Sequence, residues 1–459
     1  MPSDRPDDES SPSSPSPDPS SSPPIRRGTA LAVASVGLFV LSLLAGMALA
    51  PSVESAGAAG TDPASVTELG TDPNVTFVGV QGDPNGRVVA LDAGGTAVWE
   101  SEPSLSYHDV SVLPNGTLLA SYIQEGREEC GPYDPPCART GFRLIEMRPN
   151  AVGDAREEIR FEWSYPVRTA RASEVHDTER LPSGEYVVAD MEYESVFTVD
   201  PETGARTWVW NASSHYDPPA DPTRGDWLHI NDVDFIGEDR FLVSVRNADQ
   251  LLVVERGDGE RGGRVVEVIN DQRDTDLLRK QHNPQWLGPG AVLVADSEND
   301  RVVELHEIDG EWQVVWEVKS AGGIPFDWPR DADRLPNGNT LVTDSRNNRV
   351  VELNESGGVV WSASVSGLPY EADRGRDEYP AGPPYAGGGP DGANGSNEAT
   401  AGPTSIGESA IRLPVFHYAL SSLRHVAPVP HWVSQWHVVT FTLAVVGVVV
   451  GMGWNRRTG

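Results

Sequence analysis

A sequence unit that recurs at intervals of about 50 residues constrains the fold of this chain more than any other feature. Intervals of this length are typical of propeller repeats. One copy opens at His176 and continues into Leu181-Pro-Ser-Gly-Glu-Tyr-Val-Val188, and another opens at Asp331 and continues into Leu335-Pro-Asn-Gly-Asn-Thr-Leu-Val342. Each copy holds four short β-rich runs with alternating apolar residues, separated by turn signals such as Pro-Asn-Gly. A repeat of this kind predicts one blade of a β-propeller.

The number of units predicts a closed ring. Further copies open at His108, His229 and His282, and residues 75–99 begin one more that lacks a strand. We expect the missing strand beyond Trp361, around residues 368–374, because pairing the two ends of the repeat region leaves no open sheet edge. The prediction is therefore an all-β, six-bladed β-propeller over residues 71–375, with seven blades as the nearest alternative.

Two apolar segments flank the repeats and predict one transmembrane helix at each end. Residues 29–50 carry no charge and follow Arg26 and Arg27, and residues 432–454 have tryptophans at both edges and precede Arg456 and Arg457. Both segments are long enough to span a bilayer. Since both arginine pairs lie on the outer flanks, the positive-inside rule predicts a cell-membrane protein with cytoplasmic termini and an extracytoplasmic propeller. A signal peptide cleaved after residue 50 is the alternative for the first segment.

The remaining segments are poor in apolar residues. We expect residues 1–28 to form a disordered cytoplasmic tail, 51–70 a linker, and 376–410 a disordered linker rich in Gly, Pro and Asp. Residues 411–430 are predicted to form an interfacial segment, and residues 455–459 a cytoplasmic tail.

The charge balance excludes one class of partner. The formal net charge is −33, from 68 acidic and 35 basic residues, of which only Lys280 and Lys319 are lysines. A nucleic-acid-binding surface needs a basic footprint, so we expect no nucleic acid as partner. An acidic surface poor in lysine suits a protein that stays hydrated in concentrated salt, and indicates a halophilic source.

Two kinds of covalent modification are predicted. Cys130 and Cys137 flank six residues and are candidates for a disulfide in an oxidising compartment, with two free thiols as the alternative. Asn-X-Ser/Thr sequons outside the membrane are candidates for glycosylation. They lie at Asn74, Asn115, Asn211, Asn354 and Asn394.

Four of the ten histidines occupy one repeat position, at the opening of the innermost strand: His108, His176, His229 and His282. The innermost strands of a propeller line its central channel, so we expect these imidazoles to converge on one axis. Their pKa near neutrality suits nucleophilic or general-base chemistry. The alternative is that each histidine ties an inter-blade turn by hydrogen bonds.

Polar residues near these histidines extend the candidate site. Arg246 is expected to reach the channel and grip an oxyanion, or else to pair with Asp232 or Asp234. Further candidates for substrate binding are His108, Asn231, Asn283 and Arg330.

Three segments carry a resemblance to a known family. Asp226-Trp-Leu-His-Ile-Asn-Asp-Val-Asp234, Phe241-Leu-Val-Ser-Val-Arg-Asn247 and Gln281-His-Asn-Pro-Gln-Trp286 resemble the PAPS-independent arylsulfate sulfotransferases (arylsulfotransferase, ASST), here as a membrane-anchored, haloarchaeal-type member. The resemblance implies a six-bladed propeller that transfers a sulfuryl group from an aryl sulfate to a phenol through a sulfohistidine. It implies no cofactor and no metal.

The resemblance also implies roles for the candidate residues. His282 matches the nucleophile, His229 and Arg246 match the residues that steady the sulfuryl oxygens, and His176 is similar to the remaining channel histidine, for which His108 is a competing match. Two alternatives remain open. One is a non-catalytic propeller that binds a ligand or a surface partner, and the other is a channel whose histidines hold copper or zinc.

Overall fold

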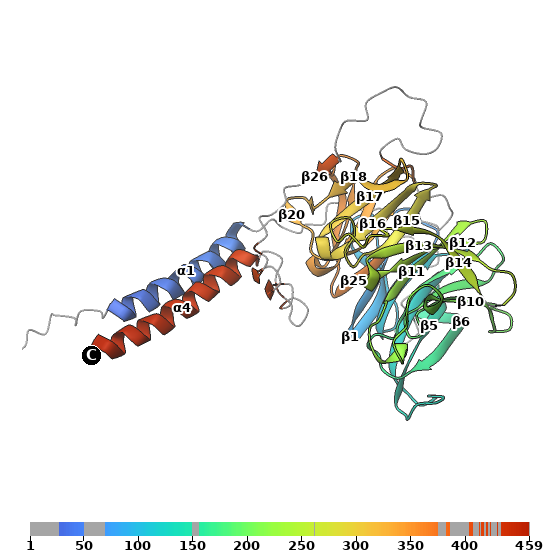
Figure 1. Ribbon diagram of the computed structural model, residues 1–459, viewed down its shortest axis with the longest axis horizontal. Helices are drawn as coiled ribbons and strands as arrows, with labels where there is room; N and C mark the ends of the chain where they lie inside the picture. The colour runs from blue at the N-terminus through green and yellow to red at the C-terminus, as the bar shows by residue number, and fades with distance from the viewer. Residues whose placement is uncertain are drawn as a thin grey trace, which may run out of the picture. The chain divides into compact units, whose positions relative to one another are not determined.

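The computed structural model describes residues 27–49, 69–148, 156–260, 262–374, 382–385, 404–406 and 435–458, and isolated residues between 413 and 434. The chain divides into two compact units. Residues 51–411 form one unit, which contains the β-sheets, and the segments 1–50 and 412–459 form the other, which contains two long helices (Figure 1).

Four sheets of the larger unit each contain four consecutive strands, paired antiparallel in sequence order. The first has β7 (Val175–Arg180), β8 (Tyr186–Asp190), β9 (Ser195–Val199) and β10 (Arg206–Asn211). The second has β11 (Ile230–Gly237), β12 (Arg240–Val245), β13 (Gln250–Arg256) and β14 (Gly263–Ile269). The third has β15 (His282–Gly288), β16 (Ala291–Asp296), β17 (Arg301–Ile308) and β18 (Glu311–Val318). The fourth has β21 (Pro329–Arg334), β22 (Thr340–Asp344), β23 (Arg349–Leu353) and β24 (Val359–Ser364). Each corresponds to one sequence repeat.

A fifth, larger sheet joins the two ends of the repeat region. It has the order β2-β1-β3-β4-β5-β6, and β25 also pairs with β1. Its strands are β1 (Thr76–Leu91), β2 (Ala97–Glu100), β3 (Ser104–Val112), β4 (Leu118–Arg127), β5 (Cys137–Met147), β6 (Glu157–Val167) and β25 (Leu368–Arg374). Residues Thr76 to Gln81 pair antiparallel with β25, so the predicted closing strand is confirmed. The sheets form a propeller-like ring, and the count of six blades stays a prediction.

Three repeats place the same turn between their first two strands. The turns begin at Leu113, Leu181 and Leu335, and in each the leucine N–H donates to the carbonyl oxygen four residues later. The glycine of each turn has a positive φ, 81° at Gly116 and 91° at Gly184, which costs glycine less than any other residue. The Leu-Pro-x-Gly signal in the sequence thus has a direct backbone cause.

The core lies between neighbouring sheets. In one cluster Val187 and Trp208 of one sheet pack with Phe241, Val243 and Leu252 of the next, and all five side chains are fully buried. Strands β8 and β9 are buried along their whole length, because sheets cover both of their faces. Burial of apolar area between the sheets is the main stabilising contribution to such a ring.

Six side chains link the first strands of successive repeats into a cycle that we call the inner belt. Each accepts a hydrogen bond from a backbone N–H of the next strand in the order β3, β7, β11, β15, β21, β25 and back to β3. The bonds are Thr178 N to Asp109 (3.2 Å), Val233 N to Asp177 (2.8 Å), Trp286 N to Asp234 (3.0 Å), Arg334 N to Gln285 (2.6 Å), Ala372 N to Asp331 (2.9 Å) and Val112 N to Asp373 (2.9 Å). The belt satisfies a backbone donor at every step of the cycle.

Residues 376–410 were predicted to form a disordered linker. The structure corrects this prediction for residues 382–385 and 404–406, which contact the strands of the larger unit. Strand β26 (Thr404–Ile406) pairs in parallel with β18. Residues 382–385 lie against β21, where the Gly382 N–H donates to the Arg334 carbonyl oxygen (2.9 Å) and the Tyr385 N–H donates to the Glu304 carboxylate (3.0 Å). The rest of the predicted linkers and tails lies largely outside the described residues.

The smaller unit contains α1 (Arg27–Leu49) and α4 (Gln435–Thr458). Both are long and apolar enough to cross a membrane, with peak mean hydropathies of 2.3 and 1.8. An N-terminal helix of this kind also meets the requirements of a signal sequence. Helix α4 runs on to Thr458, so most of the predicted C-terminal tail is helical. Most of the predicted interfacial segment lies outside the described residues.

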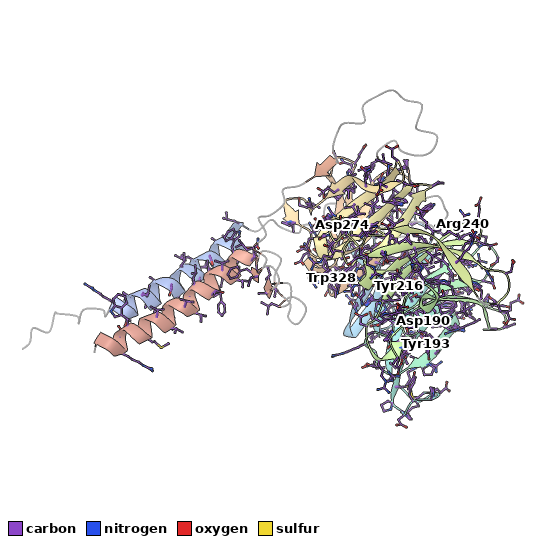
Figure 2. The ribbon with its side chains drawn as sticks, in the orientation of Figure 1. Asp190, Tyr193, Tyr216, Arg240, Asp274 and Trp328 are labelled. Carbon is purple, nitrogen blue, oxygen red and sulfur yellow. A yellow bond between two sulfur atoms is a disulfide. The ribbon has the colours of Figure 1, made fainter. Side chains whose placement is uncertain are left out.

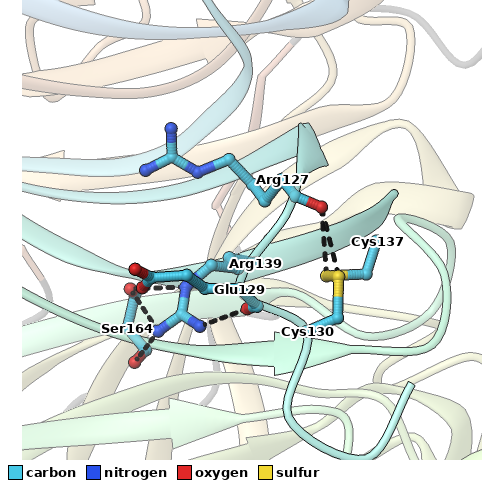
Figure 3. The surroundings of a disulfide bond; sticks show 6 residues. All are labelled: Arg127, Glu129, Cys130, Cys137, Arg139 and Ser164. Carbon is cyan, nitrogen blue, oxygen red and sulfur yellow. Dashed lines mark hydrogen bonds between the residues drawn. A yellow bond between two sulfur atoms is a disulfide. The ribbon is translucent and has the colours of Figure 1, made fainter. Parts of the chain in front are cut away.

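Cys130 and Cys137 form a disulfide (Figure 3). It joins the loop after β4 to the first residue of β5. Arg139 holds the same loop by donating to the carbonyl oxygen of Glu129 (2.8 Å) and, on β6, of Ser164 (2.7 Å). Of the candidate glycosylation sites, Asn394 lies outside the described residues. The others are exposed at Asn74, Asn115 and Asn211 and half-buried at Asn354.

Candidate active site

Strand pairing skips one residue near the start of most inner strands. The register shifts fall between the neighbours of the skipped residue, for example between Tyr107 and Asp109 and between Val175 and Asp177. A β-bulge of this kind re-aims the extra side chain. The skipped residues are His108, His176, Asn231, Arg330 and Tyr370, and in β15 the shift follows His282.

His229 is not at this position, so the prediction that four histidines share it is wrong for one of them. Asn231 occupies the bulge of β11, and His229 lies before the strand with a φ of 57°. This left-handed conformation is uncommon for a residue with a side chain and concentrates at functional sites. The turn brings the His229 ring to 5.1 Å from that of His176 nevertheless.

The four predicted imidazoles lie together. Ring centroids are 4.8 Å apart for His108 and His176, and 6.5 Å apart for His229 and His282. Tyr370 of the closing strand contacts three of the rings, at 5.2 Å from His108, 5.5 Å from His176 and 5.9 Å from His282. Residues from four repeats and the closing strand therefore form one cluster.

Two ring nitrogens in the cluster have no hydrogen-bond partner in the part of the chain that the structure describes. His108 contacts Ser106 Oγ through Nε2 (3.0 Å), which leaves its buried Nδ1 unpartnered. His176 contacts the Tyr370 hydroxyl through Nδ1 (3.0 Å), which leaves its buried Nε2 unpartnered. Buried polar atoms are normally satisfied, so these two nitrogens are free to bind a ligand or an ordered water.

The contacts of His282 define its tautomer. Its Nδ1 lies 2.8 Å from Ser297 Oγ, and the same hydroxyl donates to the Ala295 carbonyl oxygen (3.3 Å). A hydroxyl that donates there accepts from His282, so we assign the proton to Nδ1 and the lone pair to Nε2. His282 is 2% exposed, and a neutral imidazole held in this way is a competent nucleophile.

His229 lies between two charged side chains, those of Asp226 and Arg246. Its Nδ1 lies 2.6 Å from the Asp226 carboxylate and 3.4 Å from a guanidinium nitrogen of Arg246. Arg246 also pairs with Asp226 (3.7 Å), whereas Asp234, one of the alternative partners, accepts from the Trp286 N–H. Although partial burial opposes it, His229 and Arg246 lower the pKa of Asp226 to about 2. The carboxylate orients the ring and stays ionised.

Burial keeps all four imidazoles neutral at pH 7. Desolvation, reinforced by Arg330 and His229, lowers the pKa of His108 to about 3. Desolvation and Arg246 lower the pKa of His229 to about 4, against the pull of Asp226. The pKa values of His176 and His282 are well below the usual range, again chiefly through burial. The cluster thus offers lone pairs and not positive charge.

Arg330 supplies positive charge without a counter-ion. It is 1% exposed, and its guanidinium donates to Ser345 Oγ (3.1 Å), Gln81 Oε1 (2.7 Å) and the Pro369 carbonyl oxygen (3.2 Å). No carboxylate pairs with it among the described residues. Burial lowers its pKa to about 9, which leaves it charged at neutral pH. An unpaired buried charge is costly, and an anion would compensate it.

Aromatic rings surround this arginine. Its guanidinium carbon lies 3.9 Å from the Tyr370 ring and 4.6 Å from that of Trp328, the residue labelled in Figure 2. Arg346 stacks on the same indole at 4.1 Å. The Trp328 and Tyr370 rings both stand nearly edge-on to His282, at interplanar angles of 84° and 72°.

The two candidate asparagines bind neighbouring backbone and carboxylate groups. The Asn231 amide donates to the Gln281 carbonyl oxygen (2.9 Å), and its own oxygen is buried and unpartnered within the described ranges. The Asn283 amide donates to the Glu371 carboxylate (3.2 Å). Within those same ranges no group of three His, Cys, Asp or Glu residues is placed to hold a metal ion.

Three residues of the cluster were not predicted from the sequence: Tyr370, Trp328 and Arg346. A signal for Tyr370 existed, because Pro369-Tyr-Glu-Ala-Asp-Arg374 repeats Pro329-Arg-Asp-Ala-Asp-Arg334 and places the tyrosine where Arg330 stands. Trp328 directly precedes this motif and, like His229, has a left-handed φ of 56°.

Fold and site define a propeller-like protein with a buried anion-receptive cluster of neutral histidines. Residues 61–261 match the family model of the arylsulfotransferases (ASST). The matched part contains His108, His176, His229 and Arg246, and it ends before His282. No curated protein sequence matches this chain.

Several solved structures are similar in fold. A protein of unknown function from Bacteroides caccae is 15% identical, with 66% of this chain and 98% of that chain covered and a TM-score of 0.46. The periplasmic gluconolactonase of Pseudomonas aeruginosa is 14% identical, with coverages of 65% and 98% and a TM-score of 0.38. Virginiamycin B lyase of Staphylococcus aureus is 11% identical, with coverages of 57% and 70% and a TM-score of 0.35. At such identities none of these likenesses concerns activity.

Proposed function

We propose that this protein is an aryl sulfotransferase that moves a sulfuryl group from an aryl sulfate to a phenol through a sulfohistidine at His282. The observation that carries the proposal is a neutral nucleophile, His282, beside a buried guanidinium without a counter-ion, Arg330. Burial lowers the pKa of both groups. The His282 ring and the Arg330 guanidinium both contact the ring of Tyr370. The match of residues 61–261 to the arylsulfotransferase model supports the same class of reaction.

In the first half-reaction the Nε2 lone pair of His282 attacks sulfur. The nitrogen–sulfur bond forms, the bond from sulfur to the aryl oxygen breaks, and the phenolate leaves. Arg330 and Arg246 face the negative charge of the sulfuryl oxygens, because sulfuryl transfer, like phosphoryl transfer, depends mainly on positioning and charge. The aryl ring would lie against Trp328 and Tyr370, which stand beside the nucleophile.

In the second half-reaction the acceptor phenol gives its proton to His229 and attacks sulfur. The nitrogen–sulfur bond breaks, and His282 returns to its neutral form. The protonated His229 then gives its proton to solvent, from which the released phenolate is protonated, and the free enzyme is restored. His229 suits the role of base because Asp226, at 2.6 Å, stabilises the protonated ring. No cofactor takes part in these steps.

The wider arrangement is part of the same proposal. The inner belt connects six first strands in one cycle, which supports six blades. Both long helices would cross the cell membrane, with both termini in the cytoplasm and the propeller outside. Aryl sulfates and phenols would then reach the site from outside the cell.

The test is transfer by the full-length protein in high salt, with 4-nitrophenyl sulfate as donor and phenol as acceptor. We expect nitrophenol release that depends on the acceptor, and a loss of about 1,000-fold or more in His282→Ala, since removal of a nucleophile abolishes the covalent route. His215→Ala is the matched control, because this histidine is exposed.

One result would reject the enzyme. If no acceptor gives release and mass spectrometry finds no sulfated peptide containing His282, the same cluster is a binding site for an anionic ligand. The protein is then a non-catalytic propeller.

A further inference from the structure

The two apolar helices are antiparallel partners. Gly28 at the start of α1 lies against Gly451 near the end of α4, and Ser42 near the end of α1 contacts Thr440 in the first turns of α4. Phe39 and Phe441 meet edge to face between these points, with ring centroids 5.4 Å apart. The ends of the helices that lead to the propeller therefore lie at the same end of the pair.

Glycines let the two backbones approach closely. A β-carbon at Gly451 would lie 2.2 Å from the Gly28 carbonyl oxygen, and one at Gly28 would lie 2.1 Å from the Gly451 carbonyl oxygen. A β-carbon at Gly447 would lie 2.2 Å from Ser35 Oγ. Gly447 and Gly451 are one helical turn apart, the spacing by which small residues pack helices in membranes. Two further glycines of these helices, Gly37 and Gly453, have nothing within 4 Å of the position a β-carbon would take, so a side chain there would enter open space.

Polar groups also find their partners across the pair. Asn455 accepts from the Gly28 N–H (3.1 Å) and donates to Thr29 Oγ1 (2.9 Å), so α4 caps an amide that has no partner within α1. At the other end the Ser42 and Thr440 hydroxyls lie 2.9 Å apart, and His437 Nε2 lies 3.0 Å from the Ser42 carbonyl oxygen. Such groups are costly when lipid leaves them unsatisfied.

We infer that α1 is the permanent partner of α4 in a two-helix membrane anchor, and that the mature protein retains it. Cleavage after residue 50 would remove the surface that Gly447 and Gly451 fit, and would remove the groups of α1 that Asn455 and Thr440 contact. If α1 were a signal sequence removed by cleavage, there would be no reason for α4 to carry a surface that fits it. The inference does not depend on the proposed catalytic function.

The first measurement locates the N-terminus. An epitope is placed before Met1 in the full-length chain, and the membrane fraction is analysed by immunoblot and intact mass. We expect one full-length species that carries the epitope. A mature chain that begins near residue 51 would overturn the inference.

The second measurement tests the pairing. Ser42→Cys with Thr440→Cys, in a chain with a protease site added between the propeller and α4, should give fragments that stay disulfide-linked after cleavage in membranes. Gly451→Leu and Gly447→Leu should lower the linked fraction by about fivefold, in line with the modest energies of helix pairing in lipid. Gly453→Leu and Gly37→Leu add the same side chain in open space and should leave it unchanged.

Absence of the link, or an equal effect of all four leucines, would show that the helices do not pair in this register. Because leucine raises the hydropathy of either helix, failure of insertion is not expected to confound the comparison.

Discussion

Strand β21 carries two buried arginines at its two ends, in opposite electrostatic surroundings. Arg330 lies in the histidine cluster with no carboxylate partner among the described residues. Arg334 lies in the other half of the strand and pairs with the fully buried carboxylate of Glu304 at 2.8 Å. Its guanidinium also donates to Thr340 Oγ1 (3.1 Å) and to the Pro383 carbonyl oxygen (2.7 Å).

The contrast extends along the inner strands. Toward Arg334 the side chains of the inner belt accept hydrogen bonds from backbone N–H groups, whereas toward Arg330 the nitrogens of His108 and His176 and the oxygen of Asn231 are left unpartnered within the described ranges. The same strands therefore stabilise the ring at one level and hold unsatisfied groups at another. We infer that function, not stability, explains the second group.

The largest expected effect is on catalysis at Arg330. Arg330→Met should lower kcat/KM for sulfuryl transfer by about 100-fold to 1,000-fold, because it removes charge that faces the transferred group. Stability should change little, since an unpaired buried charge is replaced by an apolar side chain of similar length. Thermal unfolding and 4-nitrophenyl sulfate kinetics measure the two quantities. A large loss of stability with unchanged kinetics would contradict the contrast.

Arg334→Met should give the opposite result. Removing one member of a buried ion pair leaves Glu304 with only His306 (2.7 Å) and the Tyr385 N–H (3.0 Å) as partners among the described residues, and should destabilise the fold by about 3–5 kcal/mol. Kinetics measured well below the unfolding temperature should stay near wild type, because Arg334 does not contact the histidine cluster. Glu304→Gln with Arg334→Met removes both charges and should recover part of the loss. No recovery would mean that the ion pair is not the source.

The smallest expected effect is that of pH on the free enzyme. Because burial lowers the pKa of His229 to about 4 and holds that of His282 well below its usual value, kcat/KM should vary by less than about twofold between about pH 7 and about pH 5. The contribution of these rings to stability should fall over that range, since they gain protons more readily when unfolded, near pH 6.5 or so, than when folded. Buried carboxyls such as Glu194, whose pKa burial raises to about 7, act in the opposite direction. An acid limb of kcat/KM centred at about pH 6.5 would show that the imidazoles are solvated.

The repeat pattern predicted most of the fold. Alternating apolar runs and Leu-Pro-x-Gly turns are local signals, and they locate the strands and the closing pair of β1 and β25. The inner belt was not predictable, because each bond joins residues about 40 to 70 positions apart, or more where the ring closes, through one side chain and one backbone N–H.

The site was predicted in part. Residue type identified the histidines, Arg246 and Arg330, and the ring brought them together. The exchange of His229 for Asn231 at the bulge could not be predicted, because bulges and left-handed residues are consequences of strand register, which the sequence does not display locally. Tyr370 was missed because it lies in a single strand detached from its repeat.

The position of strand β25 near the end of the repeat region has a consequence for the synthesis of the protein. Strand β25 provides the last segment of the ring and, with Tyr370, the residue that contacts three of the four imidazoles. A ribosome must translate every earlier strand of the ring before this strand leaves the exit tunnel. Until then the growing polypeptide contains every histidine of the cluster but lacks both Tyr370 and the strand that closes the ring.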